Sequence, residues 1–371
     1  MLKKENPFWR SQVKEKKAKL SEKKTKAKRH QYPRYLLIIL FIILVLTFLA
    51  LDIALSEKKF EKIPTCGDGT FYTTCSLDKP YYCHEGILME NASVCGCPNF
   101  LKKEGDFCVL EYNMNSKNIV LKYILDRQEK EINFRTYDEV NNYVSNIPRI
   151  INYKGLEIPF RGDFKLKSIN EEIQREMILP LVKKIQNLAP DNRIQQARIA
   201  INLVQNIPYG FSEKTLSFAG QEINYSRYPY EVLNENQGIC GEKSMLLSFL
   251  LKELGYGVSI FYFVEENHEA VGIKCPVDRS FYGSGYCFVE TNRPSIITDS
   301  SIVFEGEIML ESTPEVILIS RGISLPENMY EYKDAKTLKD IREKNIFGLL
   351  KFWRFNSLKE KYGLVEVYNL G

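Results

Sequence analysis

The residues best suited to chemistry in this 371-residue chain are a cysteine, a histidine and a carboxylate that follow one another in its second half. Cys240 comes two residues after Gly238 and begins a nearly apolar run that ends at Leu254. That run predicts a buried helix, and the free N–H groups at a helix start stabilise a thiolate. A thiolate held there is suited to nucleophilic attack if a base lies beside it.

His268 is the base that the sequence offers to Cys240. Of the two other histidines, His30 precedes a long apolar stretch and His84 lies among clustered cysteines, so neither is placed to serve. His268 opens a strand-like run, and Glu290 lies near the end of a later one. A lone Cys or His is usually structural. Three such residues in this order at element edges instead predict a nucleophile, its base and the group that orients the base.

The eight other cysteines predict disulfides and therefore an oxidising compartment. Cys275 and Cys287 flank a turn-rich stretch between two strand-like runs and are expected to pair, which leaves Cys240 as the free thiol. A short stretch rich in Gly, Pro and Asn is expected to hold three disulfides, in any of fifteen pairings, among Cys66, Cys75, Cys83, Cys95, Cys97 and Cys108. Zinc is the alternative there, although the stretch lacks paired C-x-x-C knuckles.

The elements that must position these residues predict an α+β fold with a helix layer on an antiparallel sheet. A loop is expected over 208–238. Helices are expected over 138–145, 170–189, 191–207, 240–254, 336–344 and 347–361, with a kink or break at Pro180. Strands are expected over 118–124, 131–136, 258–264, 269–275, 286–291, 302–310 and 316–320.

The amino-terminal part predicts a single membrane span. Residues 1–34 hold thirteen Lys or Arg and three Glu, a net charge of +10, which leaves −6 for the rest of the chain. Residues 35–55 are apolar apart from Thr47 and Asp52, and as a helix they extend ~31 Å, enough for a hydrocarbon core of ~30 Å. Because positive charge stays inside, residues 56–371 are expected outside the cytoplasm.

This amino-terminal part has two alternative interpretations. A signal peptide cleaved at the small residues Ala54-Leu55-Ser56 competes with the span, but the leader is long and charged. A basic arm can also bind nucleic acid. The apolar stretch that follows instead favours a flank that touches lipid headgroups, so no nucleic acid is expected as a partner.

The chain thus divides into six expected regions. They are a basic cytoplasmic tail over 1–34, a transmembrane helix over 35–55, a disulfide-rich extracytoplasmic module over 56–110, an α+β lead-in region over 111–189, a catalytic core over 190–320 and accessory helices over 321–371.

An ordered set of short motifs resembles the transglutaminase-like domain, and most of all a group of archaeal membrane proteins that carry it. The resemblance covers roughly residues 195–300. It rests on Tyr228-Pro229-Tyr230-Glu231-Val232-Leu233, Gly238-Ile239-Cys240-Gly241-Glu242-Lys243-Ser244, Leu254-Gly255-Tyr256-Gly257-Val258, His268-Glu269-Ala270-Val271-Gly272 and Tyr286-Cys287-Phe288-Val289-Glu290-Thr291.

The resemblance implies a papain-like fold in which Cys240, His268 and Glu290 match the catalytic triad positions. Family members more often have Asp where this chain has Glu290, so Asn292, two residues on, is the alternative group for orienting the imidazole. The segment from Asn236 to Gly241 also resembles papain-type proteases, whose nucleophile would fall at Lys243, which argues against membership there. Gln237 is a candidate for an oxyanion hole together with the backbone N–H of Cys240.

The expected activity is attack by Cys240 on an amide carbonyl, giving a thioester that passes to water or to an amine. Hydrolysis of a bond in a peptide, surface protein or envelope polymer is favoured over amine transfer. No cofactor or metal is expected, since no loop resembles a calcium-binding EF-hand. The alternative is a catalytically inactive module of the same fold that binds partners at the surface.

Overall fold

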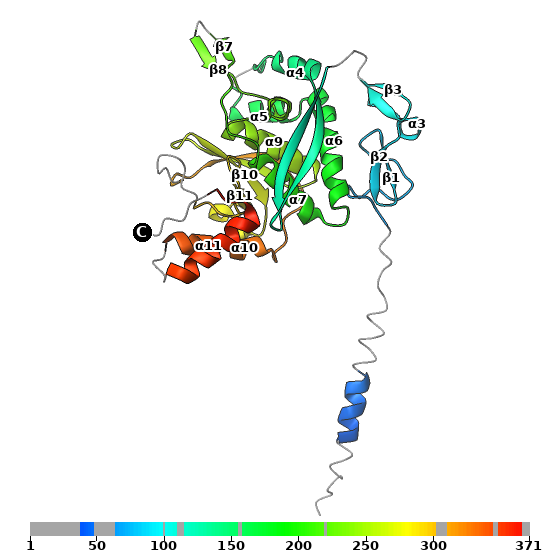
Figure 1. Ribbon diagram of the computed structural model, residues 1–371, viewed down its shortest axis with the longest axis vertical. Helices are drawn as coiled ribbons and strands as arrows, with labels where there is room; N and C mark the ends of the chain where they lie inside the picture. Colours follow the sequence, from blue (N-terminus) through cyan, green and yellow to red (C-terminus); the bar gives the residue numbers. More distant parts are fainter. Residues whose placement is uncertain are drawn as a thin grey trace, which may run out of the picture. The chain divides into compact units, whose positions relative to one another are not determined.

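The computed structural model describes residues 38–47, 64–98, 101–109, 115–154, 158–218, 221–301, 310–343 and 348–365. The chain divides into two compact units, Met1–Ile63 and Pro64–Gly371. In the first unit residues 38–47 are helical, drawn in blue in Figure 1, and their large apolar side chains are exposed. The rest of the predicted span over 35–55 lies outside the described residues. Among the described residues, no helix has both the length and the apolar character needed to cross a membrane.

The second unit begins with a small module held by three disulfides. Their partners are Cys66 with Cys83, Cys75 with Cys95, and Cys97 with Cys108. The module contains two short hairpins and one helical turn, namely β1 (Tyr81–His84) with β2 (Ile87–Glu90), α3 (Ala92–Cys95), and β3 (Lys102–Glu104) with β4 (Phe107–Val109). Only a few residues around Cys66 and Cys83 form its own apolar core, so the disulfides supply constraint that packing does not.

A long hairpin and a helix follow, close to where the alternation of apolar residues predicted them. β5 (Ser116–Leu125) pairs with β6 (Gln128–Tyr137), and α4 is Asp138–Ser145. The buried side chains of β5 recur at every second position, and β5 packs on α7 (Arg193–Gln205). The predicted helix over 191–207 is therefore present, and Asn192 caps its first turn.

The two helices that precede α7 differ in part from what was expected. α5 (Arg161–Ile169) was not predicted, because its buried positions include Gly162 and Ser168 instead of an apolar stripe. α6 (Glu172–Leu188) continues through Pro180 without dividing. The carbonyl that loses its helical donor at Pro180 is that of Glu176, a residue that is only partly buried.

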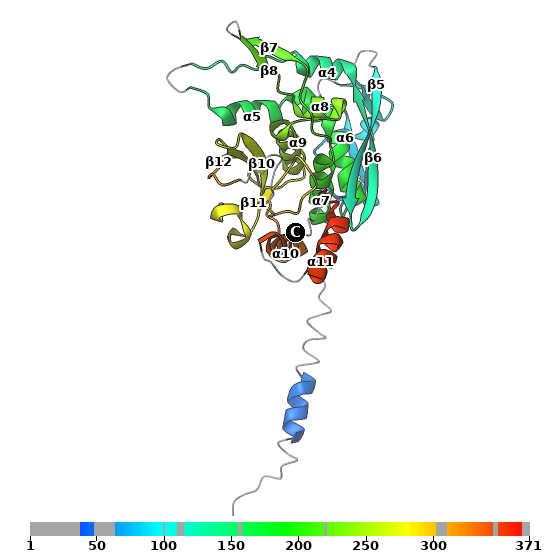
Figure 2. The same ribbon diagram turned by 60° about the vertical axis from the view of Figure 1, so that its left-hand side comes forward.

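A four-stranded antiparallel sheet forms the base of the candidate site. Its strand order is β11 (Tyr286–Val289), β10 (His268–Lys274), β9 (Val258–Phe263) and β12 (Glu315–Ser320). α9 (Cys240–Glu253) packs on β10 and β9, and α5 lies against α9 and β12, as Figure 2 shows. α9 is buried on nearly all sides, which explains why its sequence is apolar all round. This α+β arrangement is the predicted fold class.

The segment over 208–238 is not the single loop that was expected. It contains a hairpin of β7 (Thr215–Phe218) and β8 (Gln221–Asn224), and then the helix α8 (Pro229–Glu235). Most of the strand predicted over 302–310 lies outside the described residues. Near the carboxyl end α10 (Tyr330–Glu343) and α11 (Gly348–Tyr362) are present as helices.

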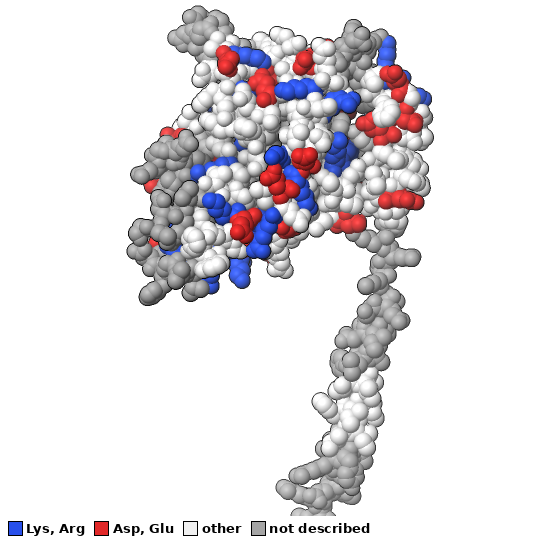
Figure 3. Space-filling model, in the orientation of Figure 1, with Lys and Arg blue, Asp and Glu red and all other residues white. Residues whose placement is uncertain are grey.

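One continuous apolar core unites these elements, because it contains side chains from β5 and β6 as well as from α9 and the sheet. A second cluster lies on the other face of the sheet, formed by Phe261, Phe263, Ala270 and Phe288. On the face seen in Figure 3, acidic and basic side chains of the described residues are interspersed.

Candidate active site

Cys240 is the first residue of α9, as its position in the sequence predicted. Ile239 precedes it with extended backbone angles (φ −86°, ψ 173°), so the helix begins at the cysteine itself. All nine cysteines lie in the described residues, and Cys240 is the one that forms no disulfide. Its side chain is half-buried. The thiol therefore lies where helical N–H groups lack intrahelical partners and where reagents from solvent can reach it.

His268 and Glu290 meet beside that helix start. The imidazole Nε2 lies 2.9 Å from Glu290 Oε2, and the side chains of His268 and Glu290 are 9% and 0% exposed. A hydrogen bond between the imidazole and Cys240 accompanies this contact. Because Nε2 is engaged by the carboxylate, Nδ1 is the nitrogen left for the thiol. The structure thus brings together the three side chains that the sequence proposed as nucleophile, base and orienting group.

Glu290 is held in place by the backbone that follows it. Its Oε1 accepts hydrogen bonds from the N–H groups of Thr291 (2.9 Å) and Asn292 (2.8 Å). The alternative orienting group, the side chain of Asn292, has a buried Oδ1 that finds no hydrogen-bond donor among the described residues. The structure therefore gives the contact with the imidazole to Glu290, and Asn292 contributes through its backbone.

The surroundings of His268 favour its charged form. Burial lowers the pKa of the imidazole, but the hydrogen bonds with Cys240 and Glu290 and their negative charges outweigh it and raise the pKa of His268 to about 10. An imidazolium between a thiol and a carboxylate is the charge state expected of a thiolate–imidazolium pair.

Lys243 is a buried lysine in this site for which the sequence gave no role. It lies one turn after Cys240 on α9 with its side chain fully buried. Its Nζ donates to the carbonyl oxygens of Ile207 (2.6 Å), Asn292 (3.2 Å) and Gln205 (3.4 Å). Lys243 therefore joins α9 to the carboxyl end of α7 and to the turn that holds Glu290.

Burial also affects the charge of this amine. It lowers the pKa of Lys243 to about 7, although the negative charges of Glu290 and Cys240 act to raise it. In the sequence, Lys243 served only as an argument against membership in the papain-type proteases, because it occupies the position where such a protease would have its nucleophile.

The start of α9 is fastened by a second buried ion pair. Glu242 accepts from the N–H of Ile239 (3.0 Å) and from that of Arg227 (2.8 Å), and its Oε2 lies 3.0 Å from Arg227 Nη1. The side chains of Arg227 and Glu242 are 0% and 1% exposed. Because Glu242 is the third residue of the helix, this pair fixes the position of Cys240 two residues earlier.

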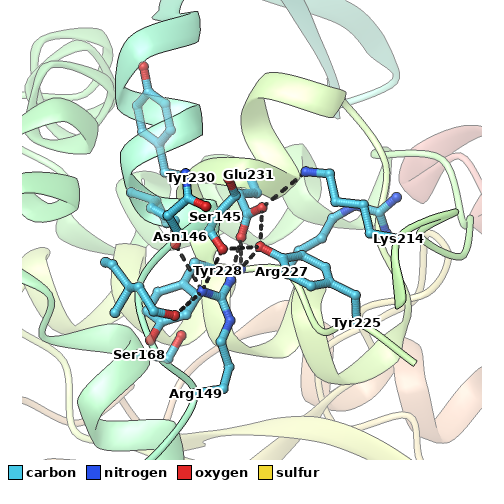
Figure 4. Close-up of polar contacts among 12 residues, drawn as sticks. Ser145, Asn146, Arg149, Ser168, Lys214, Tyr225, Arg227, Tyr228, Tyr230 and Glu231 are labelled. Atoms are coloured by element: carbon cyan, nitrogen blue, oxygen red, sulfur yellow. Dashed lines mark hydrogen bonds and ion pairs between the residues drawn. The ribbon is translucent and has the colours of Figure 1, made fainter. Parts of the chain in front are cut away.

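α8 repeats the same arrangement, which Figure 4 shows in close-up. Glu231, also the third residue of its helix, accepts from the N–H of Tyr228 (2.9 Å) and from Arg149 Nη2 (2.9 Å). The Arg149 guanidinium lies 4.2 Å from the centre of the Tyr228 ring and also donates to Tyr225. Two successive helices thus have an N-terminal glutamate paired with an arginine, and the segment between them carries Gln237 and Gly238.

Gln237, the candidate oxyanion donor, is half-buried on that segment. Its side chain lies against Gly210, where an added Cβ would come within 2.9 Å of Gln237 Oε1. The Glu269 carboxylate, held by Lys165 Nζ at 2.7 Å, lies close to Gly241, the residue after the nucleophile. Two glycines near the nucleophile, Gly210 and Gly241, are therefore approached closely by the side chains of Gln237 and Glu269, which leaves little room for a larger residue.

The strand that begins at His268 and the strand that ends just before Glu290 are tied together by a disulfide. Cys275 and Cys287 are joined, and Cys287 lies opposite Ile273 where β10 pairs with β11. The centre of the Phe263 ring lies 6.3 Å from that of the His268 ring. Among the described residues, no group of His, Cys, Asp and Glu side chains is arranged to hold a metal ion.

Comparisons with known proteins give little more. No family model and no curated protein matches this chain. Among solved structures, Legionella pneumophila LapG in its calcium-bound form is similar, with a TM-score of 0.23 and 11% sequence identity, over 48% of this chain and 99% of that chain. A likeness with so low a TM-score and identity carries no conclusion about this chain.

Proposed function

We propose that this chain is a cysteine enzyme of the transglutaminase-like type, with a papain-like core, that opens an amide bond in a protein or peptide. The observation that carries the proposal is the buried hydrogen bond of 2.9 Å between His268 and Glu290 beside the free thiol of Cys240. A structural histidine needs one partner, whereas this one has a carboxylate on one nitrogen and a thiol for the other.

The reaction begins when the Cys240 thiolate attacks the amide carbonyl carbon and forms a C–S bond. The tetrahedral oxyanion is stabilised by the N–H groups at the start of α9, with Gln237 beside them. When the C–N bond breaks, the imidazolium of His268 gives its proton to the leaving amine, and a thioester remains. His268 then takes a proton from water, which attacks the thioester and releases a carboxylic acid and the Cys240 thiolate.

Hydrolysis is favoured over transfer to an amine. Which of the two acceptors reaches a thioester depends on how far the site excludes water. Cys240 is half-buried, without the enclosure that would keep water from its thioester. We therefore place the activity among cysteine peptidases.

The location is part of the same proposal. The apolar segment over 35–55 and the positive charge before it support a single membrane anchor with residues 1–34 in the cytoplasm. Four disulfides support an extracytoplasmic place for the second unit, since disulfides persist in oxidising compartments.

The test is turnover by the purified full-length protein in detergent. A mixture of peptides is incubated with the wild type and with Cys240→Ala, with and without an added primary amine, and the products are identified by mass spectrometry. New peptide carboxyl ends that depend on Cys240 are expected, with little amine incorporated. Equal product profiles from the two proteins would contradict the proposed enzyme and favour the catalytically inactive binding module.

A further inference from the structure

Two aromatic side chains lie exposed next to the candidate nucleophile. Tyr209 and Phe211 are 51% and 64% exposed. Their ring centroids are 5.6 Å apart and the rings are nearly perpendicular, at 88°. Single exposed apolar residues need no explanation, but a pair of rings in contact presents a continuous apolar surface.

The backbone that carries the two rings is bonded to the segment before Cys240. Tyr209 forms a parallel bridge with Gly238. The N–H of Gly238 donates to the carbonyl of Pro208 (3.2 Å), and the N–H of Gly210 donates to the carbonyl of Gly238 (3.4 Å). Gly238 is two residues before the nucleophile, so the rings lie at the border of the site.

The same segment also contacts the candidate oxyanion donor. Gly210, between the two aromatic residues, is the glycine against which the Gln237 side chain packs. Gln237 would bind the oxygen of the attacked carbonyl, which belongs to the acyl part of a substrate. The rings therefore lie beside the place that the carbonyl of the attacked bond would occupy.

A buried arginine makes this arrangement rigid. Arg227 Nη1 donates to the carbonyl of Gly210 (3.1 Å) and Nη2 to that of Phe211 (3.2 Å). Its remaining contacts are with the carboxylates of Glu235 and Glu242, and Glu242 is the residue that fixes the start of α9. One buried side chain thus sets both the aromatic segment and the nucleophile, so the rings are already in place before a substrate arrives.

We propose that Tyr209 and Phe211 form an apolar subsite that binds an aromatic or branched aliphatic side chain on the acyl side of the substrate, within two residues of the attacked amide. The proposal rests on the proposed function and names the substrate class for that site. Because the charge of Arg227 is taken up by two carboxylates, the segment presents the two rings to a substrate and not a cation.

The test measures how fast Cys240 in the full-length protein is modified by dipeptidyl acyloxymethyl ketones. One probe carries two alanines, and two others carry a phenylalanine at the first or at the second position from the reactive group. Burying a phenylalanine side chain is worth roughly tenfold or more in rate. At least one phenylalanine probe is therefore expected to react about tenfold faster than the alanine probe.

Variants separate this subsite from the reactivity of the thiol. Tyr209→Ser combined with Phe211→Ser is expected to reduce the preference to within about twofold, with the rate of iodoacetamide alkylation unchanged. Trp353→Ser, an exposed aromatic residue on α11, is the matched control and should keep the full preference. The subsite is refuted if the wild type shows no preference or the double variant retains it. Alkylation by iodoacetamide that does not depend on His268 would instead refute the proposed function.

Discussion

His268 lies between a thiol and a carboxylate, and that position links the stability of the fold to pH. The pKa of His268 in the folded chain is raised to about 10 from an ordinary value near 6.5. Between these values the folded chain keeps a proton on His268 that the histidine of the unfolded chain has lost. The stabilisation is therefore complete below pH ~6.5 and is lost as the pH rises through about 10.

Urea unfolding of the wild type and of His268→Gln at pH 6, 8 and 10 measures this contribution. The free energy of unfolding of the wild type should exceed that of the variant by clearly less at pH 10 than at pH 6 or 8. Lys243, whose pKa is lowered to about 7, acts in the opposite sense in both proteins. A difference that stays constant over this range would mean that His268 is not held as an imidazolium.

Lys243 provides a second prediction for a single residue. In Lys243→Met the carbonyls of Gln205, Ile207 and Asn292 lose their donor, at an expected cost of about 1–3 kcal/mol in the free energy of unfolding. The turn that holds Glu290 is loosened at the same time, so alkylation of Cys240 should become slower at pH 7. Lys252→Met on the same helix, where the amine is partly exposed and pairs with Glu253, is the control. Equal effects of both changes would contradict a specific role for Lys243.

Much of the site could be predicted from residue types and order. The sequence proposed a nucleophile, a base and an orienting carboxylate, namely Cys240, His268 and Glu290. The structure brings these three side chains together. The role of Lys243 could not be predicted from the sequence. Its amine binds three backbone carbonyls from two distant segments, and every residue type has the same backbone carbonyl.

At the scale of elements, the start of α9 depends on the Arg227–Glu242 pair. Arg227→Met leaves the Glu242 carboxylate buried without its cation, and breaking a buried pair in this way typically costs ~3–5 kcal/mol. Thermal or urea unfolding should show a loss of that order, together with slower alkylation of Cys240. Lys339→Met, which removes an exposed i,i+4 partner of Glu343 on α10, should change stability by less than about 0.5 kcal/mol. Comparable losses in the two variants would show that Arg227 is not an anchor.

The elements that the sequence missed share a physical reason. α5 buries Gly162 and Ser168, so its pattern has no apolar stripe to recognise. α8 was missed because 208–238 was predicted as one loop. Pro229 in its first turn and Glu231 at its third position are nevertheless residues typical of a helix start. By contrast α9, β9 and β10 lie within one or two residues of their predicted bounds, because burial makes long runs of their sequence apolar.

At the scale of the whole molecule, the proposal makes a prediction about topology. Protease added to intact cells that express the chain should digest the second unit, because it is proposed to lie outside the cytoplasm. A cytoplasmic marker protein in the same cells must stay intact as the control. A second unit that remains protected along with the marker, and is digested only after the cells are opened, would place it inside.

The cysteine pattern agrees with that compartment at the same scale. The disulfide between Cys275 and Cys287 was predicted from their placement around a turn, and the structure contains it. The pairing among the six cysteines of the small module was left open, since spacing alone does not choose among fifteen connectivities.

The central claim is that Cys240 and His268 act as one reactive pair, and the rate of Cys240 alkylation by iodoacetamide between pH 5 and 10 tests it most directly. In the wild type the rate should stay close to its maximum well below pH ~8.5, where an ordinary thiol is half ionised. In His268→Ala it should fall about tenfold for each pH unit below ~8.5, as for an ordinary thiol. Asn292→Ala, which keeps the backbone contacts to Glu290 and Lys243, should behave as the wild type does. A wild-type profile that already follows the ordinary thiol and does not change in His268→Ala would contradict the pair and the enzyme built on it.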